Sequence, residues 1–210
     1  MSTSLLALLL SHFATILAIV DPFATAPIFI AITPNDTNES RKRMALQASA
    51  IACCVLLVFT FTGNWVFNFF GVSAAAFKVA GGLLLLSTAL ETLQSRESTK
   101  PQSPEEKQES FEKADITVTP LAIPLLSGPG AISTVALLGA NSKDYLEMGI
   151  VAFAVILTMF ASWIILTNST RLMKILGQIG LKIVTRIMGL LLAGLGVQFV
   201  LSGAKEFWNS

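Results

Sequence analysis

The chain has 210 residues, of which 53% are hydrophobic and only 13% are charged, and its formal net charge is +1. A soluble domain normally carries about 25% charged residues, because it must present a polar surface to water. This composition excludes an ordinary soluble protein, and the near-neutral charge gives no support for binding to nucleic acid. We therefore expect an all-α membrane protein whose first partner is the lipid bilayer.

Six apolar stretches are each long enough to cross a bilayer core, which takes a helix of about 20 residues. In chain order they are 5–32, 44–66, 72–93, 117–139, 147–167 and 184–203. The first stretch has no basic residues before it and no obvious cleavage site, so we expect an uncleaved span there and not a signal peptide. The sequence thus predicts six transmembrane helices.

Two polar breaks that contain proline interrupt the first and the fourth stretch, at Asp21-Pro22 and at Ser127-Gly128-Pro129. Asp is a preferred N-cap and Pro is favoured at the first helical position, so each break predicts a helix start inside the membrane. Spans 1 and 4 are therefore each expected to be two half-helices. Amides and carbonyls at such helix ends need cover from protein or water, which predicts a polar cavity flanked by both breaks.

Internal similarity relates the two halves of the chain. Pro129 lies 107 residues after Pro22, and the same offset aligns Gly82 with Gly189, each followed by three leucines. Because three spans are an odd number, two matching halves must enter the membrane in opposite directions. The sequence thus predicts two inverted three-helix repeats, 1–93 and 116–210, joined by a linker over 94–115. Matching halves with interrupted spans are typical of secondary transporters.

Basic residues are distributed unevenly over the connections. Eleven of the fourteen Lys and Arg residues fall between spans 1 and 2, 3 and 4, or 5 and 6, whereas the opposite side holds only Lys78, Lys143 and Lys205. Basic loops stay cytoplasmic, so both termini are expected outside the cytoplasm of a multi-pass protein of the inner (plasma) membrane. The linker over 94–115 has almost no apolar residues and is expected to be flexible and cytoplasmic.

Asp21 is the one acid deep in an expected span, and an ionised residue at that depth marks an ion or substrate path by default. Its alternative role is that of an N-cap alone, and the two roles can coexist. The other candidate substrate-binding residues surround the breaks: Pro22, Thr25, Ser127, Gly128, Pro129, Gly130 and Ser133, with Thr134 beside them. Each hydroxyl can instead bond back to its own helix. The role of His12, nine residues before Asp21, stays open.

The sequence has no pattern typical of a metal site, a disulfide, a catalytic site or an ATP-binding site. Cys53 and Cys54 are adjacent and have no further Cys or His at ligand spacing, so neither a metal site nor a disulfide is expected. One deep acid and one histidine do not form a catalytic dyad, so we expect no enzyme activity and no cofactor. The chain also lacks the phosphate-binding loop of an ATP-driven pump.

Two motifs around the breaks resemble the paired motifs of the MarC family, and the resemblance covers essentially the whole chain. They are Asp21-Pro22-x-x-x-x-Pro27-Ile28-Phe29 and Pro120-Leu121-Ala122-Ile123-Pro124-Leu125-x-x-Gly128-Pro129-Gly130-Ala131-Ile132. The chain departs from the family at Ala24-Thr25, where members usually have Gly-Asn. The resemblance implies an inner-membrane protein that moves small neutral amino acids such as alanine or glycine.

A neutral amino acid carries one carboxylate and one ammonium group, and the breaks offer a partner for each. The helix N-terminus at Gly128-Pro129 can receive the carboxylate, because anions favour that end of a helix. Asp21 can receive the ammonium group, or it can bind a proton or cation that drives transport. The sequence leaves open a passive channel, an exporter of another small-molecule class and a non-transporting membrane protein. The direction of transport and assembly into a homo-oligomer also stay open.

Overall fold

The computed structural model describes residues 2–33, 36–93 and 125–208, and the regular structure in these ranges is helical. The helices, in chain order, are α1 (Ser2–Val20), α2 (Pro22–Ile32), α3 (Asn38–Phe70), α4 (Ala74–Leu93), α7 (Pro129–Ala140), α8 (Tyr145–Thr167) and α9 (Ser169–Trp208). The all-α class predicted from the composition is confirmed.

Five helical stretches in the described ranges are long and apolar enough to cross a membrane. They are Leu5–Ile32, which joins α1 and α2, then Asn38–Gly63, Ala74–Leu93, Tyr145–Thr167 and Lys182–Trp208. The fourth expected span, 117–139, is described only from its last part, where α7 is a shorter apolar helix. Residues 117–124 and the expected linker over 94–115 lie outside the described residues.

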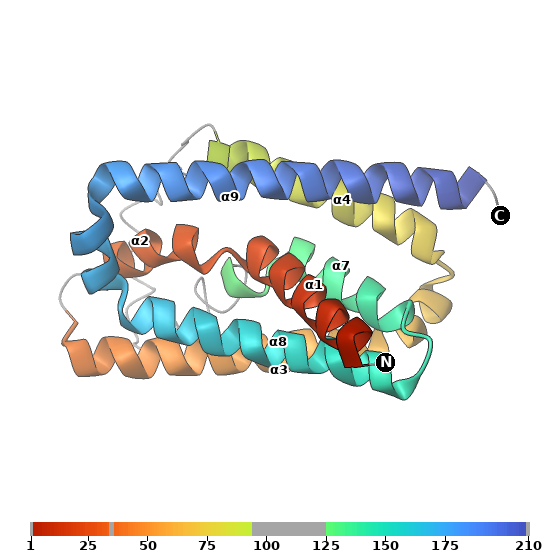
Figure 1. Cartoon of the computed structure of the whole chain (residues 1–210), viewed down its shortest axis with the longest axis horizontal. Helices are drawn as coiled ribbons and strands as arrows, with labels where there is room; N and C mark the ends of the chain where they lie inside the picture. The colour runs from red at the N-terminus through yellow and green to blue at the C-terminus, as the bar shows by residue number, and fades with distance from the viewer. Residues whose placement is uncertain (1, 34–35, 94–124, 209–210) are drawn as a thin grey trace, which may run out of the picture.

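The helices form three layers (Figure 1). In that view α4 and α9 run together along one side of the molecule, α3 and α8 run together along the other, and α1, α2 and α7 lie between them. The middle helices contact both outer pairs, since α7 packs against α3 and α4 while α2 packs against α8 and α9. One connected core of buried side chains joins the layers; it includes Ile16, Phe29, Leu56, Leu85, Leu126 and Leu192. The outer pairs thus cover two sides of the middle layer, which contains both breaks, whereas Leu6 and Leu10 on α1 are exposed, at 57% and 56%.

Small residues set the close packing of α4 against α9. They recur every seven residues, as Ala75, Gly82 and Ala89 on α4 and as Gly189, Gly196 and Gly203 on α9. A Cβ added to Gly82 would lie 2.7 Å from the carbonyl oxygen of Gly196, and a Cβ added to Gly203 would lie 2.8 Å from that of Ala75. These pairs run in opposite directions along the two helices, which are therefore antiparallel. Small residues let membrane helices approach this closely, and at Gly82 and Gly203 there is no room for a Cβ.

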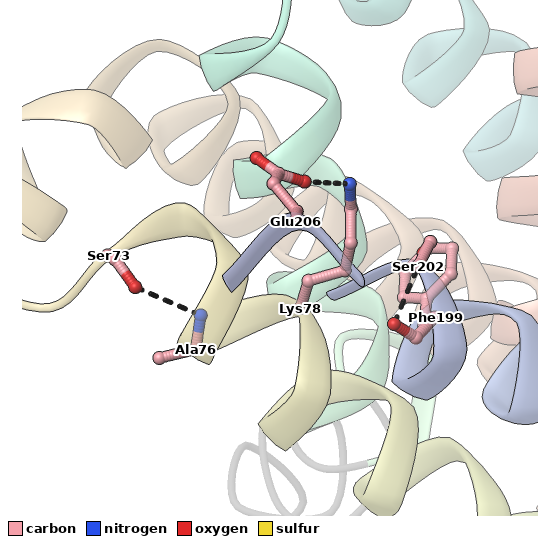
Figure 2. Close-up of polar contacts among 6 residues, drawn as sticks. All are labelled: Ser73, Ala76, Lys78, Phe199, Ser202 and Glu206. Carbon is pink, nitrogen blue, oxygen red and sulfur yellow. Dashed lines mark hydrogen bonds and ion pairs between the residues drawn. The ribbon is translucent and has the colours of Figure 1, made fainter. Parts of the chain in front are cut away.

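Polar contacts add to this helix pair at one end (Figure 2). The Lys78 ammonium group forms an ion pair with the Glu206 carboxylate, 3.0 Å away across the α4–α9 interface. The Ser73 hydroxyl caps the start of α4 by accepting a hydrogen bond from the Ala76 amide at 3.1 Å. The Ser202 hydroxyl donates to the Phe199 carbonyl at 3.2 Å. The ion pair joins the start of α4 to the end of α9, in agreement with their antiparallel arrangement.

The last helix begins earlier than the expected span of 184–203. α9 starts at Ser169 and contains one non-helical residue, Gly177, at φ 62° and ψ 179°. Before and after this kink, Ile175 and Ile179 are about four-fifths exposed, at 82% and 78%. Basic residues interrupt this first part of α9, which is why the apolar stretch in the sequence begins later. A helix with exposed isoleucines and basic residues is typical of a membrane interface.

Candidate functional site

The first span is interrupted at Asp21, as predicted. α1 ends at Val20, α2 begins at Pro22, and Asp21 between them has the left-handed backbone values φ 42° and ψ 66°. Within the described chain it is the one residue other than glycine with positive φ. Pro22 occupies the first helical position, where a missing N–H costs nothing and its fixed φ suits the helix. The turn changes the direction of the chain between α1 and α2 (Figure 1).

The Asp21 carboxylate is buried, with only 5% of the residue exposed. Its Oδ1 accepts a hydrogen bond from the Ala24 amide at 3.1 Å, which makes Asp21 the N-cap of α2. Its Oδ2 is buried and has no hydrogen-bond partner among the described residues. A buried acceptor without a partner is unfavourable. This oxygen is therefore available to an ammonium group, a cation or a proton.

The second break supplies the start of α7. Gly128 is the N-cap in an extended conformation, at φ −66° and ψ 168°, and Pro129 is the first helical residue. Within the described chain, no side chain caps this helix start. The amides of the first turn after Pro129 can therefore serve an anion, which the partial positive charge of a helix N-terminus also favours.

The two breaks lie next to each other in the middle layer. A Cβ added to Gly130 would lie 3.8 Å from Ile19 Cγ2 and 2.7 Å from Leu85 Cδ2. Ile19 is two residues before Asp21, and Gly130 directly follows Pro129, so the last turn of α1 lies beside the first turn of α7. A larger side chain at position 130 would have to displace Leu85, which is fully buried. Glycine thus allows the start of α7 to approach α4.

The predicted hydroxyl residues divide into two groups. The Thr25 hydroxyl donates to the Asp21 carbonyl at 3.1 Å, and the Thr134 hydroxyl donates to the Gly130 carbonyl at 2.8 Å. Both are therefore bound to their own helices. Ser133 is buried against α4, where a Cβ added to Gly81 would lie 2.9 Å from its Cβ. Ser127 is buried at the second break itself. The site thus rests on Asp21, Ser127 and the start of α7, with Pro22 buried and Pro129 exposed beside them.

The family model described as MarC family integral membrane protein matches residues 6–208. This chain belongs to the MarC family. The match covers both breaks, so the resemblance stated from the two motifs is confirmed.

Several MarC-family relatives align over nearly their whole length. A UPF0056 membrane protein of Methanocaldococcus jannaschii is 33% identical over 193 residues, which cover 92% of this chain and 94% of the relative. One of Aquifex aeolicus is 35% identical over 200 residues, covering 95% and 93%. The UPF0056 membrane protein YhcE of Escherichia coli is 34% identical over 195 residues, covering 92% and 90%. Their names state a membrane location and no substrate. No solved structure matches this MarC-family chain.

Arg41 has a structural role in this MarC protein. From the sequence it was identified only as one of the basic residues that predict the orientation in the membrane. Its guanidinium donates from Nε to the Thr33 carbonyl at 3.0 Å, and a terminal NH₂ group binds the same oxygen. Thr33 is the C-cap of α2, so this contact fastens the far end of α2 to the start of α3. Basic side chains are favourable at helix C-termini. In the sequence, the only indication of this contact is an Arg shortly after an expected helix end. The folded turn between α2 and α3 is what brings the Arg41 guanidinium to the Thr33 carbonyl.

Proposed function

We propose that this MarC-family protein is a secondary transporter of the inner membrane for small neutral solutes, with neutral amino acids such as alanine or glycine as its substrates. One observation carries the proposal: the unpartnered Oδ2 of buried Asp21 lies at the end of α1, whose last turn lies beside the uncapped start of α7. A negative group beside an anion-binding helix end is complementary to a zwitterion. Such binding requires no covalent chemistry.

The proposal includes two inverted three-helix repeats, with α7 as the second half of an interrupted fourth span. Contacts between α4 and α9 support this symmetry. A Cβ added to Gly82 would lie 2.8 Å from Val200 Cγ2, and one added to Gly189 would lie 3.1 Å from Leu93 Cγ. In the alignment of the two halves at an offset of 107 residues, Gly82 corresponds to Gly189 and Leu93 corresponds to Val200. The contact between Gly82 and Val200 is therefore equivalent to the contact between Gly189 and Leu93. An axis that relates inverted repeats has this effect.

The enclosure of Asp21 favours a carrier over an open channel. With 5% of the residue exposed, the carboxylate is closed off from water in this conformation. A solute therefore reaches it only when the surrounding helices move. Movement of one repeat against the other around a fixed site is the usual mechanism of transporters with inverted repeats.

The test is transport by an Asp21→Asn variant in proteoliposomes, measured as counterflow of labelled alanine. Asn has the same size, is a good N-cap and tolerates a left-handed backbone, so the variant should fold. It loses the negative charge, and we expect the flux to fall by about tenfold or more. Asp144→Asn is the matched control, because Asp144 caps α8 at an exposed position, with its Oδ1 2.8 Å from the Glu147 amide. Its flux should equal that of the wild type.

Measurement at two pH values separates the two roles of Asp21. If the carboxylate carries a coupling proton, the variant loses the pH dependence of transport as well as its rate. If the carboxylate pairs with the ammonium group, the variant also loses thermal stabilisation by alanine, since a ligand stabilises only the state that binds it. Full and pH-responsive transport by Asp21→Asn would contradict the assignment of the site. Flux that is linear in alanine concentration, without counterflow, would indicate a channel.

A further inference from the structure

A groove of about 850 Å³ opens between the start of α3 and the end of α8. Lys42, Arg43 and Leu46 line it from α3, and Trp163 and Thr167 line it from α8. The groove lies where the spans Asn38–Gly63 and Tyr145–Thr167 reach the membrane surface. In Figure 1 this is the end of the molecule opposite both the start of α1 and the end of α9. None of these lining residues belongs to either helix break.

The α8 wall of the groove carries two buried donors. Trp163 Nε1 and Thr167 Oγ1 are both buried, and neither has a hydrogen-bond partner among the described residues. They are four residues apart, so they lie on the same face of the helix. Burying a donor without an acceptor is unfavourable, so both donors would gain from an acceptor that a ligand brings to this groove.

The α3 wall adds positive charge. The side chains of Lys42 and Arg43 are exposed, and neither forms a salt bridge with a described residue. Their neighbour Arg41 is not available, because its guanidinium binds the Thr33 carbonyl. Among the described residues that line the groove, Glu39 is the one acidic residue, so two cations face one anion. Together with the two donors, this charge balance favours an anionic group such as a phosphate.

The part of the groove nearer the membrane centre is apolar. Leu46 follows Arg43 by about one turn of α3 and is 51% exposed. On α8 the ring of Trp163 packs against Phe160, with ring centroids 5.6 Å apart, and Phe160 is 54% exposed. Charged groups thus lie at the membrane surface, and exposed apolar side chains lie directly below them. A ligand that fits both parts has an anionic head and a hydrocarbon tail.

We propose that this groove is a binding site for an anionic phospholipid. The phosphate contacts Lys42, Arg43 and the donors of Trp163 and Thr167, and the acyl chains lie along Leu46 and Phe160. Basic pockets between membrane helices bind acidic headgroups in this way. The site involves neither Asp21 nor the start of α7, so it stands independently of the proposed transport.

The first test compares lipids added to the purified full chain in detergent. Phosphatidylglycerol should raise the melting temperature by several degrees more than phosphatidylcholine, and native mass spectrometry should detect bound phosphatidylglycerol. Inorganic phosphate at millimolar concentration should give little stabilisation, because it lacks the acyl chains. Equal shifts from the two lipids would overturn the proposal, and so would full stabilisation by inorganic phosphate alone.

Two groove variants assign the effect to these residues. Lys42→Gln with Arg43→Gln should abolish most of the shift due to phosphatidylglycerol. The matched control is Lys143→Gln with Lys205→Gln, which removes the same charge from exposed positions at the other end of the molecule. Trp163→Phe keeps an aromatic ring and removes the N–H donor, so the affinity for phosphatidylglycerol should fall about fivefold. Each variant is compared with its own lipid-free melting temperature, so a loss of intrinsic stability does not affect the result. A full shift in both groove variants would overturn the site.

Discussion

At the scale of single residues, Asp21 has to satisfy two local demands. Its backbone is left-handed, at φ 42°, and its side chain caps α2 through the Ala24 amide. A left-handed conformation costs most residues about 1–2 kcal/mol, whereas the short polar side chains of Asn and Asp tolerate it. The same two residue types are good N-caps. The local structure therefore accepts Asp or Asn, and what distinguishes Asp21 is the charge at an oxygen that the fold leaves without a partner.

We predict that Asp21→Ala destabilises the protein more than Asp21→Asn does. Alanine loses the cap, which costs about 1 kcal/mol. It also pays about 1–2 kcal/mol for the left-handed backbone. The control is Asp144→Ala, which loses a cap at an ordinary extended backbone, φ −147°, and should therefore cost less. Thermal unfolding in detergent without added substrate measures all three variants. Equal melting temperatures for Asp21→Ala and Asp144→Ala would contradict the contribution of the left-handed turn.

At the scale of helices, the α4–α9 pair depends on glycines that meet the opposite backbone. A Cβ on Gly196 would lie 2.9 Å from the Gly82 carbonyl oxygen and 3.0 Å from the Leu86 amide nitrogen. Those backbone atoms cannot move without shifting a whole helix. Gly194, on the same helix, has nothing within 4 Å of an added Cβ. The two glycines therefore differ in packing while their sequence context is nearly the same.

We predict opposite effects for two alanine substitutions on α9. Gly196→Ala should lower the free energy of unfolding by about 1–3 kcal/mol, because it forces overpacking at the interface. Gly194→Ala should be neutral or stabilise the protein by up to about 1 kcal/mol, because alanine is the better helix former. Thermal unfolding of the two purified variants checks the prediction. A stable Gly196→Ala variant would mean that α4 and α9 are not held at the distance observed.

At the scale of the whole molecule, the ends of the chain and the basic segments lie on opposite sides. The start of α1 and the end of α9 lie together at one end of the molecule (Figure 1). The starts of α3 and α9, which carry Arg41, Lys42, Arg43 and Arg171, lie at the other end. Basic segments stay in the cytoplasm, so this arrangement supports termini outside the cytoplasm.

We predict that cysteines placed at residues 1–3 or 208–210 react with a membrane-impermeant reagent added to intact cells. Cysteines at 98–110 should react only after the membrane is permeabilised. The native Cys53 and Cys54 are both free thiols and have to be replaced first. Labelling of 98–110 in intact cells, with protected termini, would reverse the proposed orientation.

The sequence by itself determined the features that depend on composition and on local backbone chemistry. Hydropathy gave the membrane class, because a helix in lipid must be apolar over its whole length. Asp21-Pro22 and Gly128-Pro129 predicted helix starts at the positions where α2 and α7 begin, because caps and prolines act within one turn of the chain. The two motifs around these breaks also indicated the family, which the match over residues 6–208 confirmed.

Only the tertiary structure decided which side chains meet. Ser133 was a candidate for the site from its distance along the chain, but the packing of α7 turns it toward Gly81 of α4. The sequence did not indicate a role for Trp163 and Thr167. Whether a buried donor lacks an acceptor depends on the helices that surround it in the fold. Their groove pairs α8 with Lys42 and Arg43, about 120 residues earlier in the chain. Periodicity assigns a residue to a face of its own helix, but which helix packs on that face depends on the whole arrangement of the bundle.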